Sequence, residues 1–226
     1  RPAVGERPLP LEAVASAELR EMLSRAAQYS VHSYTDSLRH GFLTLSGGHR
    51  LGICGTAAEE DGRVLGVRGL SSINRRIAHQ AEDLQAQIAR WIGTDEPQST
   101  LFLSPPGYGK TTLLREWVRY FSDRGFTAAI ADERSEIAAL ADGVPQLAVG
   151  RCTDVMEGCS KWQAAVMLLK TMSPALLALD EITAPEDAKA VSLCTHCGTA
   201  VIACAHAAGL DDLRQRPIYR ELLALG

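Results

Sequence analysis

The sequence predicts an α/β fold in which a smaller α+β domain precedes a domain built on a mainly parallel sheet. From residue 100 onward, short apolar segments alternate with helical patterns, as expected for parallel strands that are buried on both faces. Upstream, the patterns are those of hairpins and amphipathic helices. The polar segment GTDEPQS separates the two regions. We therefore expect an N-terminal α+β domain over residues 1–93, a linker over 94–99 and the larger domain over 100–226.

The expected elements of the N-terminal domain follow from local patterns. The first ten residues contain three prolines and are expected to form a loop. Apolar residues at helical spacing follow over 19–27, with Ser16 as a candidate N-cap. The segment FLTLSGGHRLGIC has two apolar halves around a Gly-Gly pair, which predicts a hairpin. The remaining expected elements are a short helix over 35–40, a turn at Asp61-Gly62 followed by a strand, a strand over 71–77 and an amphipathic helix over 80–92.

In the larger domain, apolar segments of four or five residues are the strand candidates, and longer segments with helical spacing lie between them. The expected strands are Thr100–Leu103, Ala128–Ala131, Leu176–Leu179 and Ala200–Cys204, and the expected helices are Leu113–Phe121, Trp162–Met172 and Pro185–Cys194.

Composition narrows the possible functions. With 226 residues, of which 46% are hydrophobic, the chain can bury a sizeable core. A net charge of -4 argues against a general nucleic-acid binder. The apolar runs are too short to span a membrane and no secretory signal is visible, so we expect a cytoplasmic protein whose six cysteines are reduced. The chain does not begin with Met, and we expect the N-terminal domain to be trimmed at its start.

One stretch, SPPGYGKTT, is nearly a phosphate-binding (Walker A) loop. The pattern is G-x-x-x-x-G-K-[ST], and Ser104 takes the place of the first glycine. Between a strand and a helix, such a loop turns backbone N–H groups toward phosphate oxygens, although an ordinary Gly/Pro turn is the alternative. Lys110 is placed to reach the β- and γ-phosphates of ATP, and Thr111 to bind Mg²⁺. The residues expected to bind ATP are Ser104, Pro105, Pro106, Gly107, Tyr108, Gly109, Lys110, Thr111 and Thr112.

Acidic residues follow two of the predicted strands. Asp180 and Glu181 end the segment LLALDE, which places them at the sheet edge beside the phosphate loop, with Asp180 as an expected Mg²⁺ ligand. Glu181 and Glu133 are both candidates for orienting the attacking water, and spacing does not choose between them. A helix cap and a solvated loop are the structural alternatives for these two acidic segments. His206 follows another strand on the same edge, where it can contact a γ-phosphate.

The segments around these residues resemble the stage III sporulation AA family, ATPases of endospore-forming bacteria. The matches cover most of residues 28–220, and several are more specific than the phosphate loop. Wider relatives of that family are the traffic ATPases of type II and type IV secretion and of pilus retraction. The matching segments are LRHGFLTLSGGHRLGICG (38–55), GLSSINRRIA (69–78), LFLSPPGYGKTTLLRE (101–116), ADERSEIAA (131–139), GVPQLAVGRCTDVMEGCSK (143–161), MSPALLALDEI (172–182) and AHAAGLDDLRQRP (205–217).

The resemblance implies a RecA-like P-loop NTPase domain that hydrolyses ATP in a homohexameric ring. It also implies partners among the other stage III sporulation channel proteins, and a mother-cell location peripheral to the membrane facing the forespore. In the wider group an acidic box and a histidine box flank the nucleotide, and Asp132-Glu133 and His206 fall on those positions. Asp180-Glu181 departs from the Gly-Glu of the wider group, which leaves the catalytic base open. Relatives continue past residue 226, so we expect the C-terminal end of the domain to be incomplete.

In such a ring, a neighbouring subunit can supply a cation to the transition state of phosphoryl transfer. Arg75 and Arg76 lie in the region where traffic ATPases supply such arginines. For any single arginine, a surface ion pair is the simpler interpretation. The candidates are Arg68, Arg75, Arg76, Arg134 and Arg151.

Two other functions are compatible with the same core, namely a nucleic-acid translocating ATPase and a nucleotide-gated scaffold with little turnover. A translocase needs a basic channel with aromatic side chains, and both the acidic balance and an aromatic content of 5% argue against nucleic acid as a partner. The pair Cys194 and Cys197 has the spacing of a metal or redox motif. Because no second C-x-x-C is present, we expect this pair to pack at a helix end instead.

Overall fold

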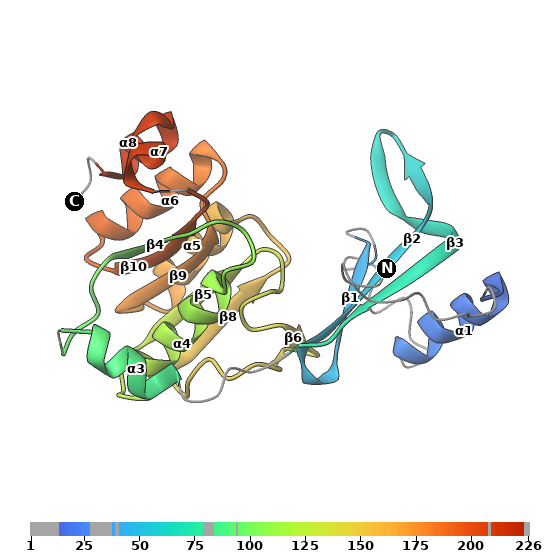
Figure 1. The fold of residues 1–226 in the computed structure, drawn as a ribbon, viewed down its shortest axis with the longest axis horizontal. Helices are drawn as coiled ribbons and strands as arrows, with labels where there is room; N and C mark the ends of the chain where they lie inside the picture. Colours follow the sequence, from blue (N-terminus) through green and yellow to red (C-terminus); the bar gives the residue numbers. More distant parts are fainter. Residues whose placement is uncertain are drawn as a thin grey trace. The chain divides into compact units, whose positions relative to one another are not determined.

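The computed structural model describes residues 14–27, 38, 41–78, 84–93, 95–207 and 209–223. The chain divides into two compact units, one comprising Arg1–Leu45 with Arg50–Arg76 and the other comprising Ser46–His49 with Ile77–Gly226 (Figure 1). Two expected elements, the loop over 1–10 and nearly all of the helix over 35–40, lie outside the described residues.

The first unit contains a three-stranded sheet. Its strands are β1 (Phe42–Leu45), β2 (His49–Glu60) and β3 (Arg63–Arg76), in the order β1-β2-β3, and β2 and β3 are antiparallel. The 3₁₀ turn η2 (Ser46–Gly48) joins β1 to β2, with Gly47 at a φ of 79°, so the predicted hairpin forms around this glycine pair. The two predicted strands around 63–77 are a single strand, β3.

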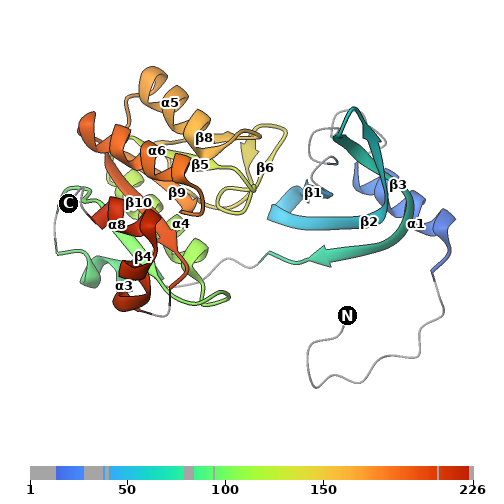
Figure 2. The same cartoon turned by 90° about the horizontal axis from the view of Figure 1, so that it is seen from above.

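Helix α1 (Ser16–Ala26) lies beside β3 in the same unit (Figure 2). Its N-cap is Ala15, whose N–H donates to Glu18 Oε2 at 2.7 Å, so Ser16 is the first helical residue and not the predicted cap. Apolar side chains from α1 and the strands form the core of the unit. The buried members of this core are Leu19, Ala27, Leu38, Leu43, Leu51, Ile53 and Leu70.

The second unit is built on a five-stranded parallel sheet in the order β4-β10-β9-β5-β8. This architecture confirms the predicted α/β class, with a mainly parallel sheet after a smaller domain. The strands are β4 (Thr100–Leu103), β5 (Ala128–Asp132), β8 (Thr153–Glu157), β9 (Leu176–Glu181) and β10 (Ala200–Ala205), and the helices are α3 (Leu84–Trp91), α4 (Lys110–Ser122), α5 (Lys161–Thr171), α6 (Pro185–His196), α7 (Leu210–Gln215) and α8 (Pro217–Leu223).

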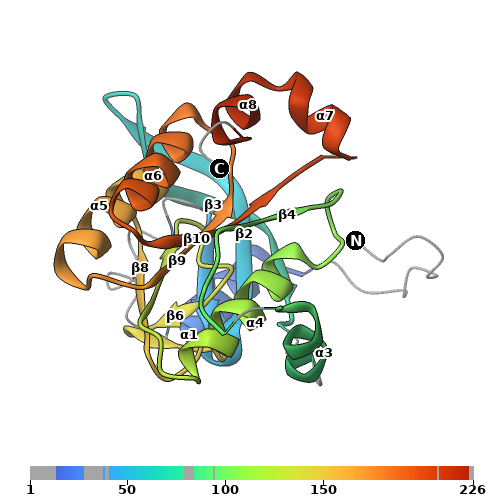
Figure 3. The ribbon, with the colours of Figure 1, turned by 90° about the vertical axis from the view of Figure 1, so that its left-hand side faces the viewer.

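Helices cover both faces of this sheet, with α4 on one side and α5 and α6 on the other (Figure 3). Successive side chains of a strand point to opposite faces. Ile130 of β5 therefore packs with Leu114 and other residues of α4, whereas Ala129 packs with Leu168 of α5. Because both faces are covered, the central strands have to be apolar throughout, and this is the pattern that the sequence displays.

Some elements of the second unit are missing from the sequence-based expectations. Strand β8, the short antiparallel pair β6 (Leu140–Ala141) and β7 (Val144–Pro145), and helices α7 and α8 were not predicted. Helix α3 packs on α4, where Gln85 Nε2 donates to Glu116 Oε2 at 2.8 Å, so α3 lies in the second unit. The domain boundary that the sequence places at 94–99 stays a prediction.

None of the helices formed by the described residues combines the length and the apolar character that a transmembrane span requires.

Candidate active site

The candidate site lies where the parallel strands of the second unit end. The phosphate loop follows β4, His206 follows β10, Asp180 and Glu181 end β9, and Glu133 follows β5. Parallel strands have their carboxyl ends on one edge of the sheet, which is where ligands bind in open α/β folds. Contacts between these residues join the ends of β4, β9 and β10, and β5, which precedes Glu133, pairs directly with β9 in the sheet.

The phosphate loop turns through two glycines in the left-handed region. Gly107 has a φ of 82°, and Gly109, the N-cap of α4, has a φ of 80°. A side chain at either position would meet open space, so it is the backbone conformation that favours glycine here. Ser104 Oγ contacts the carbonyl of Pro105 at 3.2 Å, and Tyr108 is 76% exposed. The loop thus leads directly into the N-terminus of α4, where free N–H groups favour an anion.

Lys110, at the start of α4, is buried and fully engaged. Its Nζ donates to the carbonyl oxygens of Ser104 and Pro105 at 2.9 Å each and lies 2.7 Å from His206 Nδ1. An ammonium group only donates, so His206 Nδ1 accepts, and its Nε2 carries the proton that is shared with Glu181 Oε2 at 2.9 Å. Three predicted residues thus form one array from the phosphate loop to the end of β9.

Thr111 and Asp180 form the second contact of the site. Thr111 Oγ1 lies 3.4 Å from Asp180 Oδ1, a weak hydrogen bond. Burial, followed by the carboxylates of Glu136 and Asp132, raises the pKa of Asp180 from its ordinary 3.8 to about 6, while Lys161 acts in the opposite direction. The carboxylate is therefore costly to ionise, first because it is buried and then because other carboxylates lie close to it.

This hydroxyl and carboxylate pair fits Mg²⁺ better than a metal held by protein ligands alone. Among the described residues, no cluster of three or more His, Cys, Asp and Glu side chains could hold a metal. Mg²⁺ in nucleotide sites commonly uses one or two protein oxygens, and water and phosphate complete its shell. Thr111 and Asp180 are the residues that would hold it. Thr112, the residue after Thr111 in the first turn of α4, is half-buried.

Asp132 serves the structure of the loop after β5. It is completely buried, and its carboxylate oxygens accept from the N–H groups of Glu136 and Ala138 at 2.8 Å each and of Ile137 at 3.1 Å. The loop is thereby folded around one side chain, which leaves Glu133 at its start with a side chain 39% exposed. Asp132 is thus occupied by backbone N–H groups, whereas Glu133 is partly exposed to solvent.

Glu133 is paired with a residue that the sequence did not single out. Lys161 Nζ lies 2.9 Å from Glu133 Oε2 and 3.4 Å from Asp187 Oδ2, although Lys161 is only 4% exposed. Lys161 opens helix α5, directly after β8, and therefore lies at the end of the fifth strand of the sheet. Its partners are 28 and 26 residues away in the chain, so no local pattern indicates the pairing.

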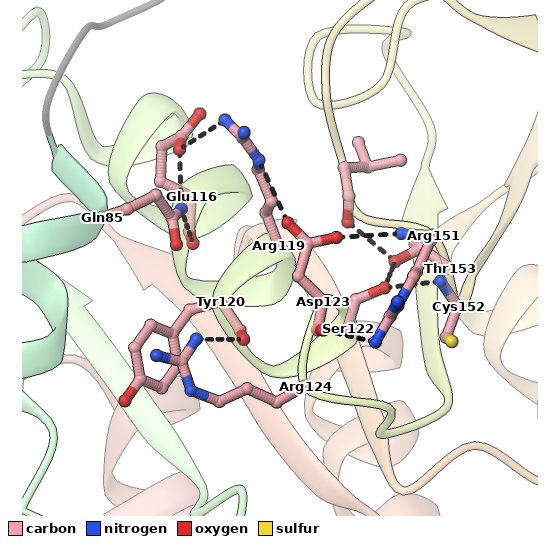
Figure 4. Close-up of polar contacts among 11 residues, drawn as sticks. Gln85, Glu116, Arg119, Tyr120, Ser122, Asp123, Arg124, Arg151, Cys152 and Thr153 are labelled. Atoms are coloured by element: carbon pink, nitrogen blue, oxygen red, sulfur yellow. Dashed lines mark hydrogen bonds and ion pairs between the residues drawn. The ribbon is translucent and has the colours of Figure 1, made fainter.

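The candidate trans arginines fall in different places. Arg75 and Arg76 are exposed on β3 of the first unit, as is Arg68, and Arg134 is exposed next to Glu133. Arg151 lies at the C-terminal end of α4, where its backbone N–H and its guanidinium both bind Asp123 (Figure 4). This is the opposite end of α4 from Lys110, so Arg151 is remote from the site of its own chain.

Of the pair that was expected to pack at a helix end, Cys194 is buried and Cys197 is not. Cys194 is buried in α6, and burial raises the pKa of its thiol to about 12, whereas Cys197 is the exposed C-cap residue of the same helix. Burial likewise raises the pKa of the Cys204 thiol to about 12. For Cys194 and Cys204, these raised pKa values are the reverse of what a metal ligand or redox cysteine requires.

Comparison with known proteins places this chain in a family. The model of the family "Sporulation stage III, protein AA" matches residues 8–225. The Stage III sporulation protein AA of Bacillus subtilis (strain 168) is 36% identical over 206 residues, which are 89% of this chain and 67% of that protein. Protein SEEDLING PLASTID DEVELOPMENT 1 of Arabidopsis thaliana is 30% identical over 128 residues, which are 55% of this chain and 19% of that protein.

Among solved structures, the Legionella pneumophila ATPase DotB superposes with a TM-score of 0.55 at 15% identity. The superposition covers 90% of this chain and 57% of DotB, so this chain spans little more than half of that protein. At this identity the likeness concerns the fold, and it agrees with the predicted RecA-like architecture. The resemblance seen in the sequence is confirmed by the match over residues 8–225 and by the Bacillus relative: the chain belongs to the sporulation stage III, protein AA family.

Proposed function

We propose that this chain is an ATP-hydrolysing motor subunit of the secretion and traffic ATPase type. The observation that carries the proposal is a set of side-chain contacts between residues at different strand ends. Lys110 contacts His206, His206 contacts Glu181, and Thr111 contacts Asp180. The fold is shared with DotB, which is an ATPase, and this supports the same class of reaction.

The chain's own residues have distinct roles in this proposal. Lys110 exchanges its carbonyl partners for phosphate oxygens, and the N–H groups of the phosphate loop complete the cradle. Thr111 and Asp180 hold Mg²⁺, which would neutralise charge on the phosphates. Once Lys110 moves, His206 loses its acceptor role at Nδ1 and becomes able to report on the γ-phosphate position. A carboxylate, Glu133 or Glu181, orients the attacking water.

At the level of assembly, we propose a homohexameric ring that acts with other stage III sporulation proteins. The ring would associate with the mother-cell face of the membrane around the forespore and supply energy to a channel there. Membership of the sporulation family supports this context. Arg75, Arg76, Arg134 or Arg151 would reach the nucleotide of a neighbouring subunit.

Steady-state phosphate release from Mg²⁺–ATP tests the proposal. We expect turnover in the wild type and none in Lys110→Ala, because the lysine contacts the transferred phosphate. Adding DNA or RNA should leave the rate unchanged. Stimulation by nucleic acid would instead indicate a translocase, and ATP binding without turnover would indicate a nucleotide-gated scaffold.

A further inference from the structure

Lys161 is a buried cation at the candidate site that the proposed roles above do not use. Its side chain is 4% exposed, and it lies close enough to Asp180 to oppose the rise in the pKa of that carboxylate. It opens α5 after the N-cap Ser160, whose Oγ accepts from Gln163 N–H in a capping box. The position is thus fixed by a well-formed helix start.

This position is unfavourable for a lysine in two ways. Burial removes the ammonium group from water, and the N-terminus of a helix carries a partial positive charge that repels it. A helix start selects acidic or small polar residues, not lysine. The carboxylates around Lys161 therefore have to offset both costs, and the identity of those carboxylates indicates what the lysine does.

One of its two carboxylate partners already has a structural task. Asp187 Oδ2 accepts from the N–H groups of Thr183 at 2.8 Å and Ala184 at 3.0 Å and so closes the start of α6. Its contact with Lys161 Nζ is the longer one, at 3.4 Å. Asp187 would keep these bonds without the lysine.

The other partner depends on Lys161. Glu133 begins an exposed part of the loop after β5, and the bond that is described for its carboxylate is the 2.9 Å contact with Lys161 Nζ. A glutamate on such a loop otherwise samples many rotamers, and fixing it requires a partner of this kind. Lys161 itself is anchored by Asp187, so it holds the Glu133 carboxylate at a defined point on the strand-end edge.

The alternative carboxylate, Glu181, is held differently. Its Oε2 accepts from His206 Nε2–H, and that histidine is bound to Lys110. In the proposed function, Glu181 is therefore part of the array that responds to the phosphates, whereas Glu133 is held by a separate cation, Lys161.

Resting on the proposed ATPase function, we propose that Lys161 is a positioning residue that fixes Glu133, and that Glu133, and not Glu181, orients the attacking water. The test compares phosphate release by the wild type, Lys161→Met, Glu133→Gln and the double variant. Glu133→Gln should lower kcat by roughly 10²-fold or more, the usual contribution of a general base. Lys161→Met should lower kcat by about tenfold or more with KM for Mg²⁺–ATP changed by less than about threefold, because it displaces the base and leaves the phosphate cradle intact.

The double variant separates positioning from a general structural effect. If Lys161 acts through Glu133, the double variant turns over no more slowly than Glu133→Gln alone. Losses that multiply would overturn the proposal. Lys161→Arg, which keeps the charge, should recover part of the rate. Lys170→Met, an exposed lysine on the same helix, is the matched control and should behave as the wild type.

A comparison that leaves Lys161 in place guards against a variant that fails to fold. Glu133→Gln should lose more in kcat than Glu181→Gln, and the reverse order would overturn the assignment. Wild-type turnover together with an unaffected Lys161→Met would remove this role and leave the proposed function standing. Absence of turnover in the wild type would remove both.

Discussion

Replacing Asp180 with asparagine should stabilise the metal-free protein, and increasingly so as the pH rises. The residue is buried, and its pKa is raised from 3.8 to about 6, chiefly by burial and then by Glu136 and Asp132. A folded-state pKa above the unfolded value means that the folded protein holds the proton more tightly. Stability is therefore lost as the pH rises from 3.8 to about 6, and the loss is complete above that range.

The size of the effect follows from the shift. One pKa unit corresponds to about 1.4 kcal/mol, so the ionised carboxylate costs the folded state roughly 3 kcal/mol at neutral pH. The stability difference changes with pH only between the unfolded pKa of 3.8 and the folded pKa of about 6, and a scan from pH 5 to pH 8 covers about one unit of that interval. The advantage of Asp180→Asn over the wild type should therefore grow by about 1.4 kcal/mol across this range.

Urea unfolding in EDTA, without nucleotide, at pH 5, 6, 7 and 8 measures this difference. Asp154→Asn, an exposed carboxylate on β8, is the matched control, and solvent screening should keep its effect small at every pH. A difference between Asp180→Asn and the wild type that stays constant from pH 5 to pH 8, or shrinks with rising pH, would falsify the claim that this carboxylate is destabilised by its surroundings.

Three further predictions concern other parts of the chain. Gly150→Ala should cost about 2 kcal/mol or more in urea unfolding, because φ is +98° and a Cβ would lie 2.4 Å from atoms of the Ser122 side chain. A thiol reagent should modify Cys204 only after unfolding, since that thiol is buried and its pKa is raised to about 12. Arg75→Ala or Arg76→Ala should lower ATP turnover while nucleotide binding by the single subunit is retained.

Each of these has an internal comparison. Gly66→Ala, where the added Cβ meets no atom within 4 Å, should cost far less than Gly150→Ala, and equal losses would contradict the steric explanation. The exposed thiols of Cys54 and Cys197 should react in the folded protein. Unchanged hydrolysis in both arginine variants would remove Arg75 and Arg76 as candidates.

The parts of the site that the sequence predicted are those whose signal is local. The phosphate loop is a contiguous pattern, and the strands that present Asp180 and His206 are buried on both faces, so they read as uninterrupted apolar runs. Strand β8 was missed because it lies at the edge of the sheet, with Asp154 exposed in its middle. Without that strand, nothing placed Lys161 at the same sheet edge as the phosphate loop.

Residues whose roles depend on tertiary partners were not separable from the sequence. Asp132 and Glu133 are neighbours in one acidic segment, yet Asp132 is buried beneath backbone N–H groups and Glu133 faces outward to a lysine. The sequence could not choose between Glu133 and Glu181 for the same reason, because both lie at the end of a predicted strand. The two carboxylates differ in their partners, which are Lys161 for Glu133 and His206 for Glu181. Each partner follows a different strand of the sheet.

The partners of Lys110 and Lys161 help to explain why Asp180 is costly to ionise. Lys110 is engaged by carbonyls and His206, and Lys161 by Glu133 and Asp187, so both nearby lysines are already engaged by other partners. Asp180 is buried and close to further carboxylates, which raise its pKa in that order, and Lys161 offsets only part of the cost of ionising it. A divalent cation at Thr111 and Asp180 would offset the remaining cost, so metal binding and folding stability are expected to be coupled here. If Asp180 is a metal ligand, as we propose, this local cost in stability is the kind of charge arrangement that functional sites retain.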